Sequence, residues 1–184
     1  MEKDRVKWNR RYKEGRGTEK PADVIRQFYP LAPKGKALDI AAGNGRNALF
    51  LADRGFDVDA VDVSDVAVKA LSGIHPSVNA ICADLDTYNI TPAHYSLIVN
   101  IRFLNRRLFP YIKEGLKPGG LLIFESYVED DRTISPLSCR DFLLRENELL
   151  HAFLSLKIIY YEEKDAESRY GTTRTAALAG VKVA

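Results

Sequence analysis

The sequence ALDIAAGNGRNALFLADRGFDVDAVD, from Ala37 to Asp62, predicts a strand, a glycine turn, a helix and a second strand. Residues 37–41 have the length and apolar character of a strand, and the glycines at 43 and 45 break this run. Apolar residues then recur at helical spacing over 48–52, and Gly55 ends the helix. A run rich in β-forming residues follows and ends on Asp62. Together these elements form half of a doubly wound nucleotide-binding unit.

The turn after the first strand has the chemistry of a ligand site. Glycines let the backbone approach a ligand closely, and the N-terminus of the following helix directs its free N–H groups at that ligand. Asp62 lies at the tip of the second predicted strand, where a carboxylate accepts hydrogen bonds from both hydroxyls of a ribose. The sequence therefore predicts an adenosine derivative as the ligand.

Asp39 distinguishes between two adenosine cofactors. Gly43, Gly45 and Ala48 satisfy the G-x-G-x-x-G/A pattern of NAD-binding proteins. A carboxylate at the end of the first strand, however, faces the place where the pyrophosphate of NAD would lie, and like charges there are costly, whereas an ammonium group is favoured. S-adenosylmethionine carries an ammonium group and no phosphate, so it is the predicted cofactor. An NAD-dependent oxidoreductase is the weaker alternative, because its Tyr-x-x-x-Lys spacing, Tyr160 to Lys164, falls on a predicted strand.

The segment Leu38–Arg46, LDIAAGNGR, resembles motif I of the class I S-adenosylmethionine-dependent methyltransferases, an acidic residue followed by G-x-G-x-G. Ala41 stands where that pattern has its first glycine. Residues 83–85, Ala-Asp-Leu, resemble the place where the acidic residue of the family meets the adenine, and residues 116–124 resemble the turn into the fifth strand. Trp8–Tyr12 and Gly45–Asn47 are similar to the tellurite-resistance and thiopurine methyltransferase branch of the family.

This resemblance implies an enzyme that transfers a methyl group from S-adenosylmethionine to a small-molecule acceptor: a thiol, a heterocycle or a chalcogen oxyanion such as tellurite. It implies one domain over residues 1–184, with a doubly wound, Rossmann-like α/β fold. The sheet is expected to have seven mostly parallel strands, a C-terminal antiparallel hairpin and helices on both faces. The residues that the resemblance and the strand ends together mark for cofactor binding are Trp8, Arg11, Tyr12, Asp39, Ala41, Gly43, Asn44, Gly45, Arg46, Asn47, Asp62, Val63, Asp84, Leu85 and Asn100. A non-catalytic regulatory module that binds S-adenosylmethionine is an alternative, because it would keep the same pocket.

The composition argues against several other classes of protein. The chain has 184 residues, 46% of them hydrophobic, which is enough for one sizeable core. A net charge of +2 is too mild to indicate a nucleic acid or a membrane surface as partner, and no apolar leader is visible, so a cytoplasmic location is expected. Cys82 lies in an apolar run and is expected to be buried, while the spacing of the three histidines predicts no metal site. The oligomeric state is left open.

Local patterns predict the remaining elements. Helices are expected over 4–13, 21–29, 64–71, 102–116 and 140–153, and strands over 78–82, 95–100, 156–163 and 173–183. Pro110 falls near the first turns of its helix as an interruption. The polar connection 128–138 is longer than most loops, and loops of that length are often functional.

The first twenty residues have two interpretations. Trp8 and Tyr12 lie on a charged helix that is followed by the flexible joint 15–18. In one interpretation they are hydrophobic anchors that hold the helix on the domain. In the other, which the resemblance to the thiopurine branch favours, residues 1–20 form a lid that excludes water from the cofactor.

The acceptor is expected beyond the carboxyl ends of the fourth and fifth strands, where ligands of open α/β sheets bind. The candidate substrate-binding residues there are Arg102, Phe103, Tyr127 and Arg140. Five arginines in or beside these segments form either an anion-receptive mouth or a solvated charged face. They are Arg102, Arg106, Arg107, Arg132 and Arg140. Methyl transfer requires no metal and no covalent intermediate. A base is needed only for a protonated acceptor, for which Glu125, Tyr127 or a solvent-facing histidine is a candidate, and no catalytic residue is assigned.

Overall fold

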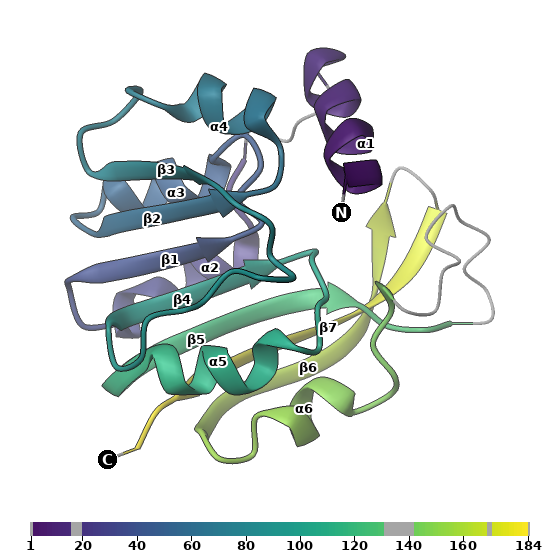
Figure 1. Cartoon of the computed structure of the whole chain (residues 1–184). Helices are drawn as coiled ribbons and strands as arrows, with labels where there is room; N and C mark the ends of the chain where they lie inside the picture. The colour runs from purple at the N-terminus through teal and green to yellow at the C-terminus, as the bar shows by residue number, and fades with distance from the viewer. Residues whose placement is uncertain (1, 16–19, 131–141, 169–170, 184) are drawn as a thin grey trace.

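The computed structural model describes residues 2–15, 20–130, 142–168 and 171–183, which build one seven-stranded sheet with helices on both faces (Figure 1). The strand order is β3-β2-β1-β4-β5-β7-β6, with β7 antiparallel to both of its neighbours and all other pairs parallel. The predicted Rossmann-like architecture with its C-terminal antiparallel hairpin is therefore confirmed.

The elements follow the chain in an alternating order. The strands are β1 (Lys36–Ile40), β2 (Asp57–Asp62), β3 (Val78–Cys82), β4 (Tyr95–Ile101), β5 (Leu116–Tyr127), β6 (Lys157–Ser168) and β7 (Gly171–Val181). The helices are α1 (Glu2–Lys13), α2 (Asp23–Phe28), α3 (Arg46–Ala52), α4 (Asp65–Leu71), α5 (Leu108–Gly115) and α6 (Glu148–Ala152), with a 3₁₀ turn, η1, at Tyr29–Leu31. No helix among the described residues is long and apolar enough to cross a membrane.

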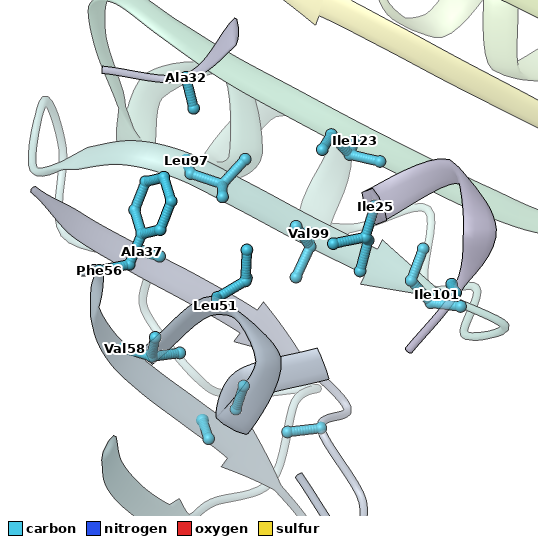
Figure 2. Close-up of a cluster of buried hydrophobic side chains, with 14 of the residues drawn as sticks. Ile25, Ala32, Ala37, Leu51, Phe56, Val58, Leu97, Val99, Ile101 and Ile123 are labelled. Carbon is cyan, nitrogen blue, oxygen red and sulfur yellow. The ribbon is translucent and has the colours of Figure 1, made fainter. Parts of the chain in front are cut away.

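The sheet separates two hydrophobic cores because successive side chains of a strand point to opposite faces. Figure 2 shows the first core, in which Ile25 of α2 and Leu51 of α3 pack against Val58, Leu97 and Ile123 of the sheet. On the other face α5 and α6 cover the sheet, and the second core includes Leu38, Ile98, Ile112, Phe124 and Phe153. Nearly continuous burial of β1, β2 and β4 follows from this double cover.

Three predicted helices are shorter in the structure. The helix expected to open at Pro21 begins at Asp23, because Ala22 has an extended backbone (ψ 139°). The helix expected over 102–116 begins only at Leu108, because Arg102 has a left-handed backbone (φ 60°) and Pro110 takes its place in the first helical turn, where its missing N–H costs nothing. The helix expected over 140–153 is confined to α6. Asn147 precedes it with φ 57°, and Leu144 pairs with Val128 instead of continuing a helix.

The prediction that Cys82 is buried is wrong. Cys82 is an exposed free thiol, because β3 is an edge strand and the described chain between β3 and β4 forms turns rather than a helix. The turn expected at residues 116–120 is a bulge, since Tyr95 pairs with Leu116 whereas Leu97 pairs with Leu121. Only residues 128–130 of the long connection lie within the described part, and Arg132, Cys139 and Arg140 fall outside it.

Candidate cofactor and acceptor site

The carboxyl ends of β1, β2 and β4 bring the predicted cofactor residues together. β1 lies between β2 and β4, so the turn after Ile40 has the turn after Asp62 on one side and Asn100 on the other. Ala41, Gly43 and Gly45 all have positive φ, which folds the turn tightly ahead of α3. A Cβ added to Gly43 would lie 2.3 Å from the hydroxyl of Tyr12, so only glycine fits under α1 at this position.

Asp62 is the organising group of this site. Its Oδ2 accepts a hydrogen bond from the backbone N–H of Gly43 and its Oδ1 accepts one from Ser64, each at 2.8 Å. Burial raises the pKa of the Asp62 carboxyl, and hydrogen bonds from the backbone N–H groups of Ser64, Gly43 and Val63 oppose this rise. Because a carboxylate has about four acceptor positions and three backbone N–H groups use it, an acceptor position remains for a hydroxyl of a ligand.

Asp39 is buried, and its Oδ2 has no hydrogen-bond partner among the described residues. Burial raises the pKa of its carboxyl to about 7, although the positive charge of Arg46 and a hydrogen bond from the Ala48 backbone oppose the shift and Asp62 adds to it. A buried carboxylate oxygen without a donor is costly. A cationic donor on a ligand would remove that cost.

The first residues of α3 tie the site to the segment that leads into α2. The guanidinium of Arg46 donates to the carbonyl of Lys20 at 2.9 Å, and the buried side chain of Asn47 accepts a hydrogen bond from the Ala22 N–H at 3.1 Å. The Asn47 side chain thus serves the protein's own backbone. Asn44 lies in the turn itself, half-buried.

Helix α1 covers the turn from the side of α4 (Figure 1). Burial is the largest cause that raises the pKa of Tyr12, whose hydroxyl lies over Gly43. The ring centroids of Trp8 and Tyr12 are 6.0 Å apart, and the Arg11 guanidinium lies 4.8 Å from the centre of the Trp8 ring. No residue of α1 is fully buried, so the helix sits on the domain rather than in its core.

The turn after β3 is fixed from two directions. Asp84 accepts a hydrogen bond from the Asp86 N–H at 2.9 Å, and Leu85 is buried in the second core. Arg107 donates to the carbonyls of Leu85 and Tyr88 at 3.1 and 3.0 Å, which holds this turn against the start of α5. The Asn100 side chain donates to the Phe103 carbonyl at 2.7 Å.

On the acceptor side, the arginines are largely engaged. Arg102 forms an ion pair with Glu125 at 3.0 Å and lies 4.4 Å from the centre of the Tyr127 ring. Arg106 pairs with Glu148 at 2.5 Å, and Arg107 bonds carbonyls as described above. The described arginines of the predicted anion-receptive mouth, Arg102, Arg106 and Arg107, thus all have partners within the protein.

A shallow pocket of about 300 Å³ opens beside this cluster. Phe103, Arg106 and Phe142 line it together with Asp4 from the first turn of α1. Its lining does not include Asp39, Asp62 or the glycine turn, so it is separate from these predicted cofactor residues. No group of three or more His, Cys, Asp or Glu side chains within the described ranges is arranged to hold a metal ion.

The contacts of two polar residues were not predicted from the sequence. Asn9 bonds the start of α4 through its side-chain amide, and Arg107 clamps the β3–β4 turn. Asn9 precedes Tyr12 by three residues and so shares its helix face, a spacing from which its contact with the domain was predictable. The role of Arg107 has no local signal, because its acceptors lie about twenty residues away.

Comparison with known structures assigns the fold to a class. The structure superposes on the crystal structure of TehB from Haemophilus influenzae with a TM-score of 0.77 and 24% sequence identity. The superposition covers 94% of this chain and 65% of that chain. A second neighbour is a phosphoethanolamine N-methyltransferase from Haemonchus contortus, with a TM-score of 0.67, 18% identity, and coverage of 88% of this chain and 52% of that one. The fold is that of the class I S-adenosylmethionine-dependent methyltransferases.

Sequence comparison narrows the class to a family. Residues 4–175 match the family described as Tellurite resistance protein TehB, and the chain belongs to this family. A protein of Haemophilus influenzae named probable S-adenosyl-L-methionine-dependent methyltransferase TehB is 29% identical over 156 residues, which are 79% of this chain and 54% of that protein. The chain thus spans about half the length of the curated relative it matches.

Proposed function

We propose that this protein binds S-adenosylmethionine and transfers its methyl group to a small-molecule acceptor. The observation that carries the proposal is the pair of carboxylates around the glycine turn. Asp39 offers a buried oxygen that lacks a donor among the described residues, and Asp62 is oriented by backbone N–H groups. An amino acid ammonium group and a ribose diol are the ligand groups that fit these two carboxylates. The names of two relatives, a probable S-adenosyl-L-methionine-dependent methyltransferase and an N-methyltransferase in complex with S-adenosylhomocysteine, support the same cofactor.

Each part of the site would have a separate role. Asp39, with Ala41, Gly43, Asn44, Gly45, Arg46 and Asn47, would surround the amino acid end of the cofactor. Asp62 and Val63 would hold the ribose, while Asp84, Leu85 and Asn100 would flank the adenine. Trp8, Arg11 and Tyr12 would cover the ligand as part of a lid formed by residues 1–20. Because the side chains of Asn47 and Asn100 already bond the protein's own backbone, their part would come from backbone groups.

When bound, S-adenosylmethionine supplies a methyl group on a sulfonium, which passes in line to a nucleophile as the carbon–sulfur bond breaks. The protein would contribute chiefly by holding the two reactants in line and excluding water, and such positioning can supply about 7–11 kcal/mol. α1 closes the site on one side, and Arg102, Glu125 and Tyr127 border the acceptor side. Glu125 is held by Arg102, so it would act as a base only if the acceptor displaced that ion pair.

For the acceptor we propose a small thiol, a heterocycle or a chalcogen oxyanion such as tellurite. The family description names tellurite resistance, which supports the oxyanion. The aromatic rings of Phe103 and Tyr127 at the border of the site support a planar heterocycle equally. Arg140, the fourth predicted substrate residue, lies outside the described residues.

Titration calorimetry tests the cofactor. We expect binding of S-adenosylmethionine and of S-adenosylhomocysteine, and no comparable binding of NAD. Tighter binding of NAD would overturn the assignment of Asp39 to an ammonium group. The structure already places Tyr160 and Lys164 on strand β6, as expected, and not on one face of a helix. A screen of small acceptors with S-adenosylmethionine labelled in its methyl group then identifies the acceptor class.

A non-catalytic S-adenosylmethionine-binding module is the second candidate. The ion pair between Arg102 and Glu125 favours it, because that pair occupies the carboxylate that is the candidate base. Such a module would bind the cofactor in calorimetry and transfer no label in the screen. Transfer of label to any thiol, heterocycle or oxyanion excludes it.

A further inference from the structure

The side chain of Asn9 joins α1 to the first turn of α4. Its Oδ1 accepts a hydrogen bond from the Ser64 hydroxyl at 2.6 Å, and its Nδ2 donates to Oδ1 of Asp65 at 2.7 Å. The Val66 N–H also approaches Asn9 Oδ1 at 3.5 Å. Asn9 thus uses both ends of its amide on three successive residues of one turn, an arrangement that fixes the helix in position as well as in rotation.

These contacts lead directly to the cofactor residues. Ser64 is fully buried and caps α4 by accepting a hydrogen bond from the Ala67 N–H, and its own N–H donates to Asp62. The other oxygen of Asp62 accepts from Gly43, and the hydroxyl of Tyr12 lies over this glycine. A closed path of contacts therefore runs from Asn9 through Ser64, Asp62 and Gly43 back to α1.

We infer that Asn9 is a positioning residue that couples the docking of α1 to the orientation of the Asp62 carboxylate. The inference rests on the proposed function, in which Asp62 holds the ribose. Since no residue of α1 is fully buried, apolar packing alone determines the position of this helix on the domain only weakly. The paired hydrogen bonds of Asn9 determine that position more specifically. Undocking of α1 would free the Ser64 hydroxyl and uncover the turn at Gly43.

Substitutions at positions 9 and 65 test the two hydrogen bonds of the Asn9 amide. Asn9→Ala removes both hydrogen bonds. Asn9→Asp keeps an acceptor for the Ser64 hydroxyl but faces the Asp65 carboxylate with a second negative charge. In the double variant Asn9→Asp, Asp65→Asn the donor and the acceptor have exchanged places, so the hydrogen bond between positions 9 and 65 can form again.

The measurements are calorimetric binding of S-adenosylhomocysteine and the emission of Trp8, the only tryptophan of the chain. We expect Asn9→Ala to weaken binding about three- to tenfold and Asn9→Asp to weaken it at least as much, each with a smaller ligand-induced change in Trp8 emission. The exchanged double variant should recover most of the affinity and the emission change, which a loss of general helix stability would not allow.

Arg10→Ala is the matched control, because Arg10 is the next residue of the same helix and its side chain is exposed. Asp65→Asn alone controls for the altered charge at the start of α4. If the unmodified protein does not bind S-adenosylhomocysteine, the proposed function fails. If it binds, and Asn9→Ala matches Arg10→Ala in affinity and emission, or the double variant recovers nothing, the inference about Asn9 is overturned.

Discussion

Protonation of Asp39 should control cofactor affinity. Its pKa is about 7 in the ligand-free protein, and a cationic ammonium group requires the carboxylate form. At pH 7 about half of the sites are ionised, at pH 6 about a tenth and at pH 5 about a hundredth. Affinity for S-adenosylhomocysteine should therefore fall about fivefold between pH 7 and pH 6 and about tenfold more by pH 5, a range in which the amino group of the ligand stays protonated.

Calorimetry measures this linkage in two independent ways. The dissociation constant is followed from pH 5 to pH 7, and the number of protons released is obtained at pH 7 in buffers of different ionisation enthalpy. Because the ammonium group stabilises the ionised form, binding lowers the pKa of Asp39, and about half a proton should leave at pH 7. Asp39→Asn is the matched variant, since it keeps the shape of the side chain and cannot ionise.

Asp39→Asn should bind S-adenosylhomocysteine weakly, and its affinity should depend much less on pH. The pH dependence that remains would report Asp62, because burial also raises the pKa of that carboxyl. Equal slopes in the unmodified protein and in Asp39→Asn would refute the reasoning. Uptake of protons on binding would refute it as well, because it would mean that the ligand favours the neutral carboxyl.

Four further outcomes are expected. The pKa of Asp39 in the folded protein lies above its unfolded value near 3.9. Asp39 therefore contributes fully to the stability of the ligand-free protein below pH 4, and this contribution is lost as the pH rises through 7. The loss is of the order of 4 kcal/mol, and denaturant unfolding of Asp39→Asn should lack it. Asp62→Ala should weaken cofactor binding at least tenfold in calorimetry with circular dichroism unchanged, because hydrogen bonds to a charged group contribute about 1.5–3 kcal/mol each; an unchanged dissociation constant would remove Asp62 from the site. Gly45→Ala should cost about 2–4 kcal/mol in denaturant unfolding, since its Cβ would lie 2.3 Å from Leu71, whereas Gly55→Ala, at a similar φ and in open space, should cost about 1–2 kcal/mol; equal costs would show that Leu71 yields freely. Deletion of the first fourteen residues should reduce turnover far more than the thermal midpoint, and S-adenosylhomocysteine should protect the joint after α1 from trypsin; unfolding of the truncated chain would instead identify Trp8 and Tyr12 as anchors.

The central unit of the fold was predictable because its signals are local. An apolar run, a glycine turn and a helical period follow one another over residues 37–62, and β1, α3 and β2 lie within two residues of the predicted bounds. The late start of α5 and the short length of α6 were not predictable, since tertiary contacts override the local hydrophobic period in both places. Leu144, for example, is fully buried in a bridge to Val128, which no pattern around residue 144 reveals.

The same distinction applies to the site. Asp39, Gly43 and Asp62 could be predicted to lie close together because a strand end and a turn define their places, and their part in cofactor binding stays a prediction. Whether an arginine near the mouth is available to a ligand depends on partners far away in the sequence, as with Arg106, whose carboxylate partner is Glu148. The exposure of Cys82 likewise depends on the order of strands in the sheet, which places β3 at an edge.

The position of β7 has a consequence for synthesis on the ribosome. β7 is made after both β5 and β6, yet it lies between them and pairs with each along most of its length. Until it emerges, β5 presents an unpaired edge with Leu122 and Phe124, and β6 has no strand to join. A nascent chain that has reached only β6 should therefore depend on chaperones or remain prone to pairing with other strands, and this half of the sheet is expected to form only after β7 has been made.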